Sequence, residues 1–338
     1  PCISDYDHPI SLLLYNTRLY MTNFYDIIRI RKGGKNMKKR NLLIIILSLL
    51  FILTGCTSKQ EKTKTLRDNT PQVYLPTLGN EKMNDSTVEL DISNRSCGYI
   101  MLNYKGTNEK VKIQITSPKN VDYIYPVTKN NEFITYPLPE ESGTYKIMVL
   151  ESTDIQSNRY AICFSKEIDV KLKNKYSPFL YANYYISFQE DSTCVKKAQE
   201  LAKNCYSSLD VVSNVYNYII ENVAYDKQKA KNIQYGYVPN PDETLETKTG
   251  ICFDYASLMS AMLRSQGIPT KLEVGYVGEV YHAWISCYVD EIGWVDNIIE
   301  FDGKNWSLID PTLGANNKKS DVKKYIGNGH NYLVKYTY

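Results

Sequence analysis

The sequence predicts an α+β protein in which an antiparallel β-sandwich precedes a second domain of helices and strands. Apolar residues alternate with polar ones between about Thr87 and Lys173, as in half-buried strands. After Lys173 the apolar spacing becomes helical, and the alternation returns beyond Gly267. The 338 residues are 43% hydrophobic and 23% charged, which is ordinary globular composition and long enough for two domains.

The first 55 residues have the pattern of a leader. A basic segment, Met37-Lys-Lys-Arg, precedes an uncharged stretch of 15 residues from Asn41 to Gly55, which is shorter than the roughly 20 residues that span a bilayer. We therefore expect residues 37–55 to be a secretory signal peptide. Residues 1–36 lie upstream of this complete signal and begin with Pro1, so we interpret them as an over-extended reading frame.

The signal ends in Leu53-Thr-Gly-Cys, which resembles a bacterial lipobox and implies cleavage before Cys56 and lipid attachment to its thiol. The polar residues 56–86 that follow have little to bury and predict a flexible tether. We expect an extracellular protein held by lipid on the outer face of the cytoplasmic membrane. The abundant Ile, Lys and Asn favour a low-GC Gram-positive source.

The charge of the chain argues against nucleic acid as a partner. From Cys56 onward there are 32 basic and 34 acidic residues, so the excess of basic residues belongs to the leader. No basic stripe remains that would neutralise a phosphate backbone.

Residues 87–173 are the predicted β-sandwich domain. Turn residues separate the alternating segments, and their number predicts about seven short strands. The clearest alternating sets are Val88, Leu90 and Ile92; Val111, Ile113 and Ile115; Tyr145, Ile147 and Val149; and Tyr160, Ile162 and Phe164. No catalytic combination occurs among these residues, so a binding role and a purely structural role both stay open.

Residues 174–338 are the predicted α+β domain, and it begins with helices. Ser192–Cys205 and Leu209–Val223 have helical apolar spacing. A third helix follows Gly250, with Gly267 and then a proline as its stop signals. Cys252 lies in or just before the first turn of this helix. There the free amide groups and the helix dipole lower a thiol pKa, although a buried structural cysteine is the alternative.

Two further segments favour a catalytic role for Cys252 over a purely structural one. An alternating strand from Glu279 to Val289 contains His282, and a hairpin turning at Asp302-Gly303 leads to Asp310. Cysteine chemistry needs such a set, because a thiolate attacks an acyl carbon, an imidazole moves protons and a carboxylate orients the imidazole.

These segments resemble the transglutaminase-like superfamily, whose core is papain-like. The matching residues are Gly250-Ile-Cys-Phe-Asp-Tyr-Ala, Leu263-Arg, Gly267-Ile-Pro, Gly275-Tyr, His282-Ala-Trp and Asp310-Pro-Thr. The resemblance implies Cys252 as nucleophile, His282 as general acid and base, and Asp310 as the orienting carboxylate. The long stretch from Asp290 to Asn305 departs from the family pattern, and it predicts an extra hairpin before Asp310.

An oxyanion hole would use the Cys252 backbone amide and one more donor. Tyr225, Tyr235 and Tyr237 precede the cysteine helix and are the candidates, with simple packing as the alternative for each.

The other cysteines do not form an obvious disulfide framework. Cys194 and Cys205 are 11 residues apart in one helical pattern, too far to bridge, and Cys287 lies on the strand face opposite His282. Cys97 with Cys163 is the one plausible pair. The chain has no C-x-x-C and no H-x-x-x-H, so we expect no metal site and no cofactor.

The sequence therefore predicts a cell-surface cysteine enzyme that acts on amide bonds of a protein or a peptidoglycan peptide through a thioester. Hydrolysis and transfer to an amine both remain open, because they share the acyl-enzyme. A non-catalytic adaptor that binds cell-wall or protein ligands is the alternative. The 30 tyrosines leave two explanations open, an aromatic binding surface and compositional bias.

Overall fold

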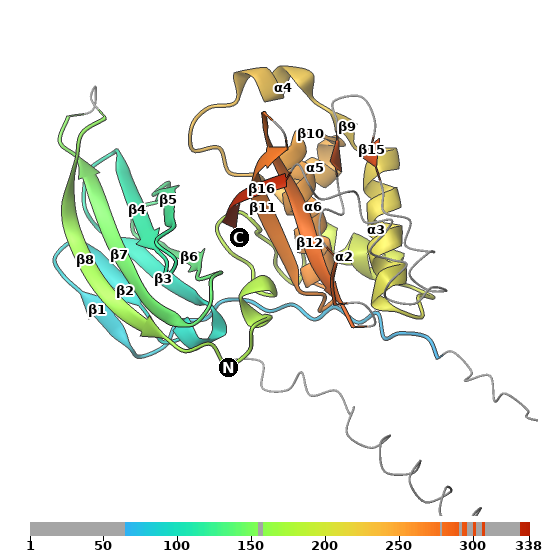
Figure 1. The fold of residues 1–338 in the computed structure, drawn as a ribbon, viewed down its shortest axis with the longest axis horizontal. Coiled ribbons are helices and arrows are strands. Elements are labelled where there is room, and N and C mark those ends of the chain that lie inside the picture. Colours follow the sequence, from blue (N-terminus) through green and yellow to red (C-terminus); the bar gives the residue numbers. More distant parts are fainter. Residues whose placement is uncertain are drawn as a thin grey trace, which may run out of the picture. The chain divides into compact units, whose positions relative to one another are not determined.

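The alternating segments form a β-sandwich in the computed structural model of this chain (Figure 1). The structure describes residues 65–154, 158–277, 279–290, 293–295, 300–301, 306–307 and 332–338. The predicted leader, Cys56 and Asp310 lie outside these residues. Among the described residues, no helix is long and apolar enough to cross a membrane.

Eight described strands make up the sandwich, where the alternation predicted about seven. They form two four-stranded antiparallel sheets, with strand orders β1-β2-β3-β6 and β5-β4-β7-β8. The strands are β1 (Lys82–Asn84), β2 (Val88–Asp91), β3 (Tyr99–Tyr104), β4 (Val111–Thr116), β5 (Asp122–Pro126), β6 (Phe133–Pro137), β7 (Gly143–Ser152) and β8 (Tyr160–Val170). A short 3₁₀ helix, η1 (Arg95–Cys97), connects β2 and β3.

The inward faces follow the predicted alternation except in β8. Val111, Ile113 and Ile115 of β4 are all buried. In β8 the pairing register shifts, so that Val149 pairs with Phe164 while the next residue of β7 pairs with Ile162. This bulge buries Phe164 and leaves Ile162 57% exposed, so the prediction that both belong to one buried row is wrong.

The second part of the chain contains helices and a mixed set of strands. The helices are η2 (Ser177–Phe179), α2 (Thr193–Leu201), α3 (Ser208–Asn222), α4 (Lys227–Asn232), α5 (Pro241–Thr247) and α6 (Cys252–Arg264). The strands are β9 (Ala224–Tyr225), β10 (Thr249–Gly250), β11 (Thr270–Val277), β12 (Val280–Val289), β13 (Gly293–Val295), β14 (Glu300–Phe301), β15 (Trp306–Ser307) and β16 (Tyr332–Thr337). The predicted α+β fold with antiparallel sheets is confirmed.

Helix α6 packs on a four-stranded antiparallel sheet of order β13-β12-β11-β16 (Figure 1). Its apolar residues share a core with the β12 side chains that alternate on one face, Ala283, Ile285 and Cys287. His282 therefore belongs to the other set of β12 side chains. Beyond β12, the stretch 290–305 adds β13 to this sheet, and β14 pairs with β15 as a separate hairpin.

Arg264 joins the end of α6 to three other segments. Its guanidinium is fully buried and donates to the carbonyl oxygens of Thr270, Tyr181 and Tyr338 at 2.6 to 2.9 Å. Burial lowers the pKa of Arg264 to about 9, which still leaves the group charged at neutral pH. The four hydrogen bonds to backbone oxygens satisfy this buried cation.

Tyrosines from both parts of the chain pack together. Tyr125 of β5 lies 5.5 Å from Tyr185 and 5.9 Å from Tyr338, measured between ring centroids, and Tyr123 lies 5.7 Å from Tyr336. The sandwich and the α+β part accordingly belong to one compact unit that spans residues 65–338. These tyrosines are core residues rather than an exposed binding surface.

The described part of the predicted tether lies along the folded unit. The backbone N–H groups of Arg67 and Gln72 donate to the carbonyls of Cys205 and Ser265, at 2.8 and 2.7 Å. Tyr74 forms a parallel bridge with Tyr181. Polar side chains suggested a free segment, but backbone groups make these contacts regardless of side-chain polarity.

Two predictions about the cysteines need correction. Cys163 carries a free thiol that contacts the Val149 carbonyl, so the pairing of Cys97 with Cys163 is wrong. Cys194 and Cys205 are both free, but they do not share one helix, because α2 ends at Leu201.

Candidate active site

Cys252 is the first residue of α6, as the sequence predicts. The turn before it is shaped by Asp254, whose Oδ2 accepts the backbone N–H of Ile251 at 2.8 Å. Gly250 lies so close to this carboxylate that a Cβ added there would be 2.7 Å from the Asp254 Cβ. The Gly250-Ile251-Cys252-Phe253-Asp254 segment is thus a capped helix start that leaves the cysteine at the N-terminal end.

Cys252 and His282 line the same cavity, which has a volume of about 380 Å³. His282 is buried on β12, where it pairs with Gly275 of β11. The next residue, Ala283, directs its backbone N–H at the Cys252 thiol, as does Phe253. The helix start and the β12 strand therefore bring the two predicted catalytic residues together.

The environment of the Cys252 thiol differs from the prediction in one respect. Burial raises the pKa of Cys252 above its ordinary value, and this effect exceeds the opposite effect of the Ala283 and Phe253 N–H groups. The nearby Asp254 carboxylate also raises the pKa. The helix start alone does not make Cys252 a thiolate, so deprotonation requires a base.

Tyr225 is the oxyanion candidate that lies beside Cys252. Strands β9 and β10 pair in parallel, which sets Tyr225 opposite Gly250, two residues before Cys252. Burial raises the pKa of the Tyr225 hydroxyl, and the nearby Cys252 backbone N–H acts in the opposite direction. Tyr225 also lines the cavity.

The hydroxyl of Tyr237 has another partner. Tyr237 lines the cavity, but it donates its hydroxyl proton to Oδ1 of Asp254, and Lys229 Nζ donates to its oxygen at 2.7 Å. Lys229 also forms an ion pair with Asp254 Oδ2 at 2.8 Å. Tyr237 therefore holds the loop after α4 against the cysteine helix.

Tyr235 lies away from the reacting groups. It is 76% exposed, and its ring lies 5.1 Å from Lys112 Nζ of the sandwich. It does not belong to the described residues that line the Cys252 cavity. Asp310, the third predicted catalytic residue, lies outside the described residues.

A match to a family model covers this site. Residues 195–297 match the model of the transglutaminase-like superfamily. The chain contains a transglutaminase-like domain. The match includes Cys252 and His282, and it ends before Asp310.

Two relatives match stretches of this chain that are longer than the transglutaminase-like domain. A UPF0252 protein of Methanocaldococcus jannaschii is 27% identical over 208 residues, which is 55% of this chain and 58% of that protein. YebA of Bacillus subtilis is 22% identical over 258 residues, which is 62% of this chain and 34% of that protein. The chain thus spans little more than half of the length of the UPF0252 protein and about a third of the length of YebA.

Among solved structures, the chain is similar to a candidate cysteine protease from Cytophaga hutchinsonii. The identity is 16%, the TM-score is 0.31, and the similarity covers 64% of this chain and 68% of that one.

Four aromatic residues of the cavity were given no role in the site by the sequence analysis. Tyr185, Phe253, Tyr281 and Tyr338 line it together with Cys252. Tyr185 packs on Phe253 at 5.1 Å and on Tyr338 at 4.8 Å between ring centroids. Tyr281 alternates with Ala283 on β12, and this alternation was the one sequence signal that could have found it.

Proposed function

We propose that the protein is a cysteine enzyme that acts on amide bonds of proteins or peptides through a thioester acyl-enzyme. The observation that carries this proposal is the shared cavity of Cys252 and His282, with the Ala283 N–H directed at the thiol. A nucleophile, a proton carrier and amide donors in one apolar hollow are the groups that acyl transfer needs.

His282 is the base that the raised pKa of Cys252 makes necessary. As the Cys252 sulfur attacks the acyl carbon, His282 takes the thiol proton, and it then protonates the departing amine. A water molecule or a lysine amine subsequently attacks the thioester, with His282 removing a proton from it. Asp310 is assigned to orient the imidazole on the strength of the family resemblance.

The Cys252 backbone N–H and the Tyr225 hydroxyl are the proposed oxyanion donors. In the free protein the N–H lies near the Tyr225 oxygen and lowers the pKa of that hydroxyl, against the larger effect of burial. A developing oxyanion replaces that acceptor, and the hydroxyl then turns its own proton toward the oxyanion. Both groups lie at the N-terminal end of α6, where the helix dipole favours negative charge.

A non-catalytic adaptor is the second candidate, and the raised pKa of Cys252 favours it. A binding protein has no need for a thiolate, and burial raises the pKa of the Cys252 thiol.

Trapping of the acyl-enzyme separates the two candidates. The protein is incubated with blocked glutamine peptides and peptidoglycan stem peptides, and intact mass and peptide mapping then locate any adduct. We expect a thioester on Cys252 that is absent in Cys252→Ala, much slower in His282→Ala, and unchanged in Cys163→Ser, since Cys163 lies in the sandwich. Substrate binding without any adduct would favour the adaptor.

The proposed location is the outer face of the cytoplasmic membrane, with Cys56 as the lipidated residue. The support is the sequence of residues 37–56. Two acyl chains bury enough methylene groups for stable attachment. We expect the cellular protein to partition into detergent and Cys56→Ala to remain in the aqueous phase; equal partitioning of both would contradict the lipid anchor.

A further inference from the structure

Strands β11 and β12 extend past the start of α6 and carry a row of apolar side chains there. Ala283 of β12 belongs to the face that packs on α6, and its N–H is directed at Cys252, the first residue of that helix. Tyr281 lies on the same face, one pleat further out. Tyr276 of β11 pairs with Tyr281, and Leu333 of β16 pairs with Tyr276, so these three side chains share that face. We call them the apolar row.

The apolar row is accessible from outside. Tyr281 is 55% exposed, Leu333 is 54% exposed and Tyr276 is 38% exposed. The rings of Tyr276 and Tyr281 meet edge to face with 5.3 Å between their centroids, so they form one continuous surface. Tyr281 also lines the Cys252 cavity and therefore lies at its mouth. Large apolar side chains that gather at the edge of a cavity, instead of being scattered singly, indicate a binding surface.

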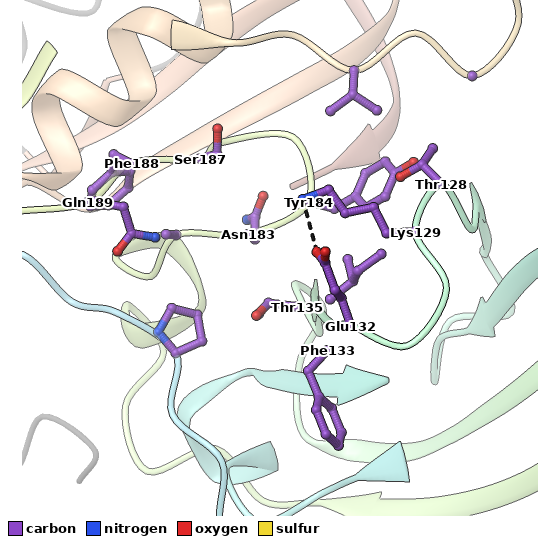
Figure 2. A pocket seen from close by; sticks show the side chains of 15 residues that line it. Thr128, Lys129, Glu132, Phe133, Thr135, Asn183, Tyr184, Ser187, Phe188 and Gln189 are labelled. Atoms are coloured by element: carbon purple, nitrogen blue, oxygen red, sulfur yellow. Dashed lines mark ion pairs between the residues drawn. The ribbon is translucent and has the colours of Figure 1, made fainter. Parts of the chain in front are cut away.

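The cavity behind the row offers no counter-ion to a charged side chain. Among the described residues that line it, none is Asp, Glu, Lys or Arg, and its titratable groups Cys252 and His282 are taken up by the proposed reaction. A larger pocket beside β6, with a volume of about 650 Å³, differs in this respect, because Lys129 and Glu132 form an ion pair of 3.0 Å in its wall (Figure 2). A charged group that entered the Cys252 cavity would lose water without gaining a partner. The cavity therefore favours uncharged side chains.

We propose that the enzyme selects polypeptides with a large apolar residue beside the scissile amide, and that the side chain of this residue packs on Tyr281 and Tyr276. The proposal rests on the proposed function, which supplies the attack of Cys252 on that amide. The α-carbons of neighbouring residues are ~3.8 Å apart, so a substrate whose amide carbon reaches the Cys252 sulfur has its next residue close to the mouth of the cavity. The side chains of peptidoglycan stem peptides are short or charged, so this selection favours proteins as substrates.

Peptide binding tests the selection without turnover. Three blocked, fluorescein-labelled pentapeptides with a central glutamine are titrated with Cys252→Ala protein, and their anisotropy gives the dissociation constants. The residue on both sides of the glutamine is phenylalanine, alanine or aspartate. We expect the phenylalanine peptide to bind about tenfold more tightly than the alanine peptide, because its rings bury apolar area, and the aspartate peptide to bind most weakly.

Variants of the apolar row show where the preference arises. Tyr281→Ser and Tyr276→Ser each remove an exposed ring, so the preference for phenylalanine over alanine should fall from about tenfold to about twofold. Tyr281→Phe keeps the ring and should keep the preference. Tyr206→Ser is the matched control, because Tyr206 precedes α3 and is 52% exposed, almost as much as Tyr281. It should leave all three dissociation constants unchanged.

The outcomes separate this proposal from the proposed function. Absent binding of the phenylalanine peptide, equal affinities for the phenylalanine and alanine peptides, or a preference that survives in both serine variants would overturn the proposal. Displacement of the phenylalanine peptide by chito-oligosaccharide would also overturn it, in favour of a sugar-binding surface. If the preference depends on Tyr281 but no thioester forms on Cys252, the binding surface stands and the proposed function fails. If thioesters form equally fast with the phenylalanine and alanine peptides, the function stands and the selection fails.

Discussion

Lys229 Nζ lies 2.8 Å from Oδ2 of Asp254, a carboxylate that is completely buried two residues after Cys252. Lys229 belongs to α4, whose following loop forms one wall of the active-site cavity. The ion pair therefore attaches that wall to the helix that begins at Cys252.

Replacing Lys229 tests this attachment. Lys229→Met leaves the Asp254 carboxylate buried without its cation, so we expect a loss of about 1–3 kcal/mol in unfolding free energy, less than for a fully buried pair because Lys229 is partly exposed. Urea denaturation measures this loss. Lys227→Met, at an exposed position of the same helix, is the control. Equal midpoints for the two variants would show that the ion pair contributes nothing to the fold.

The pH dependence of Cys252 alkylation follows from its raised pKa. In His282→Ala no imidazole takes the thiol proton, so the iodoacetamide rate should rise with pH through a midpoint above the ordinary thiol value of about 8.5. With His282 present, the profile should shift to lower pH. The alkylation reaction is stopped at several times at each pH, and mass spectrometry measures the fraction of labelled Cys252 in both proteins. Identical profiles in the two proteins would remove His282 from the role of base.

The raised pKa also predicts how stability changes with pH. Because the folded state holds the Cys252 proton more tightly than the unfolded chain, stability from this group is complete below the ordinary thiol pKa and is lost as pH rises through the folded pKa. The Cys252→Ala variant lacks this loss. The melting temperature of the parent protein should therefore fall relative to that of Cys252→Ala as the pH rises above the ordinary thiol pKa, whereas parallel curves would contradict the pKa direction.

Tyr225→Phe tests the second oxyanion donor. The variant keeps the ring that packs near Tyr255, with 6.4 Å between centroids, and removes the hydroxyl beside the Cys252 N–H. We expect the acylation rate to fall by about 10²-fold, as for other oxyanion donors, with little change in melting temperature. Tyr218→Phe on α3 is the control. Retention of the full rate would assign Tyr225 to packing.

Arg264→Lys tests the buried guanidinium. Lysine keeps the charge but cannot reach the carbonyls of Thr270, Tyr181 and Tyr338 at once. Unpaired buried groups then cost about 2–4 kcal/mol of unfolding free energy, measured by denaturant titration. The reverse exchange Lys171→Arg, at an exposed site, should have no effect. A stable Arg264→Lys protein would show that the four hydrogen bonds are dispensable.

The sequence was most informative where the signal is local. The helix start at Cys252 and the strand that carries His282 follow from spacing and stop residues close in the chain, and both are confirmed as elements. The pKa of Cys252 was predicted in the wrong direction, because burial comes from residues such as Tyr185 and Tyr338 that are distant in sequence.

Other features could not be found from one-dimensional patterns. The bulge in β8 inserts a residue without changing the apolar spacing, so Ile162 was predicted as an inward residue. The parallel pairing that brings Tyr225 to Cys252 involves only two residues on each strand, too few for a periodic signal. Sequence reasoning therefore named Tyr225, Tyr235 and Tyr237 together, and only tertiary structure distinguishes them.

The packing of Tyr125 against Tyr185 and Tyr338 has a consequence for how this protein can be divided. A gene fragment that begins at residue 195, where the family match begins, would omit both Tyr125 and Tyr185, and Tyr185 lines the Cys252 cavity together with Tyr338. A fragment that keeps this wall of the cavity therefore has to include the segment before residue 195 and the β-sandwich strand that packs on it.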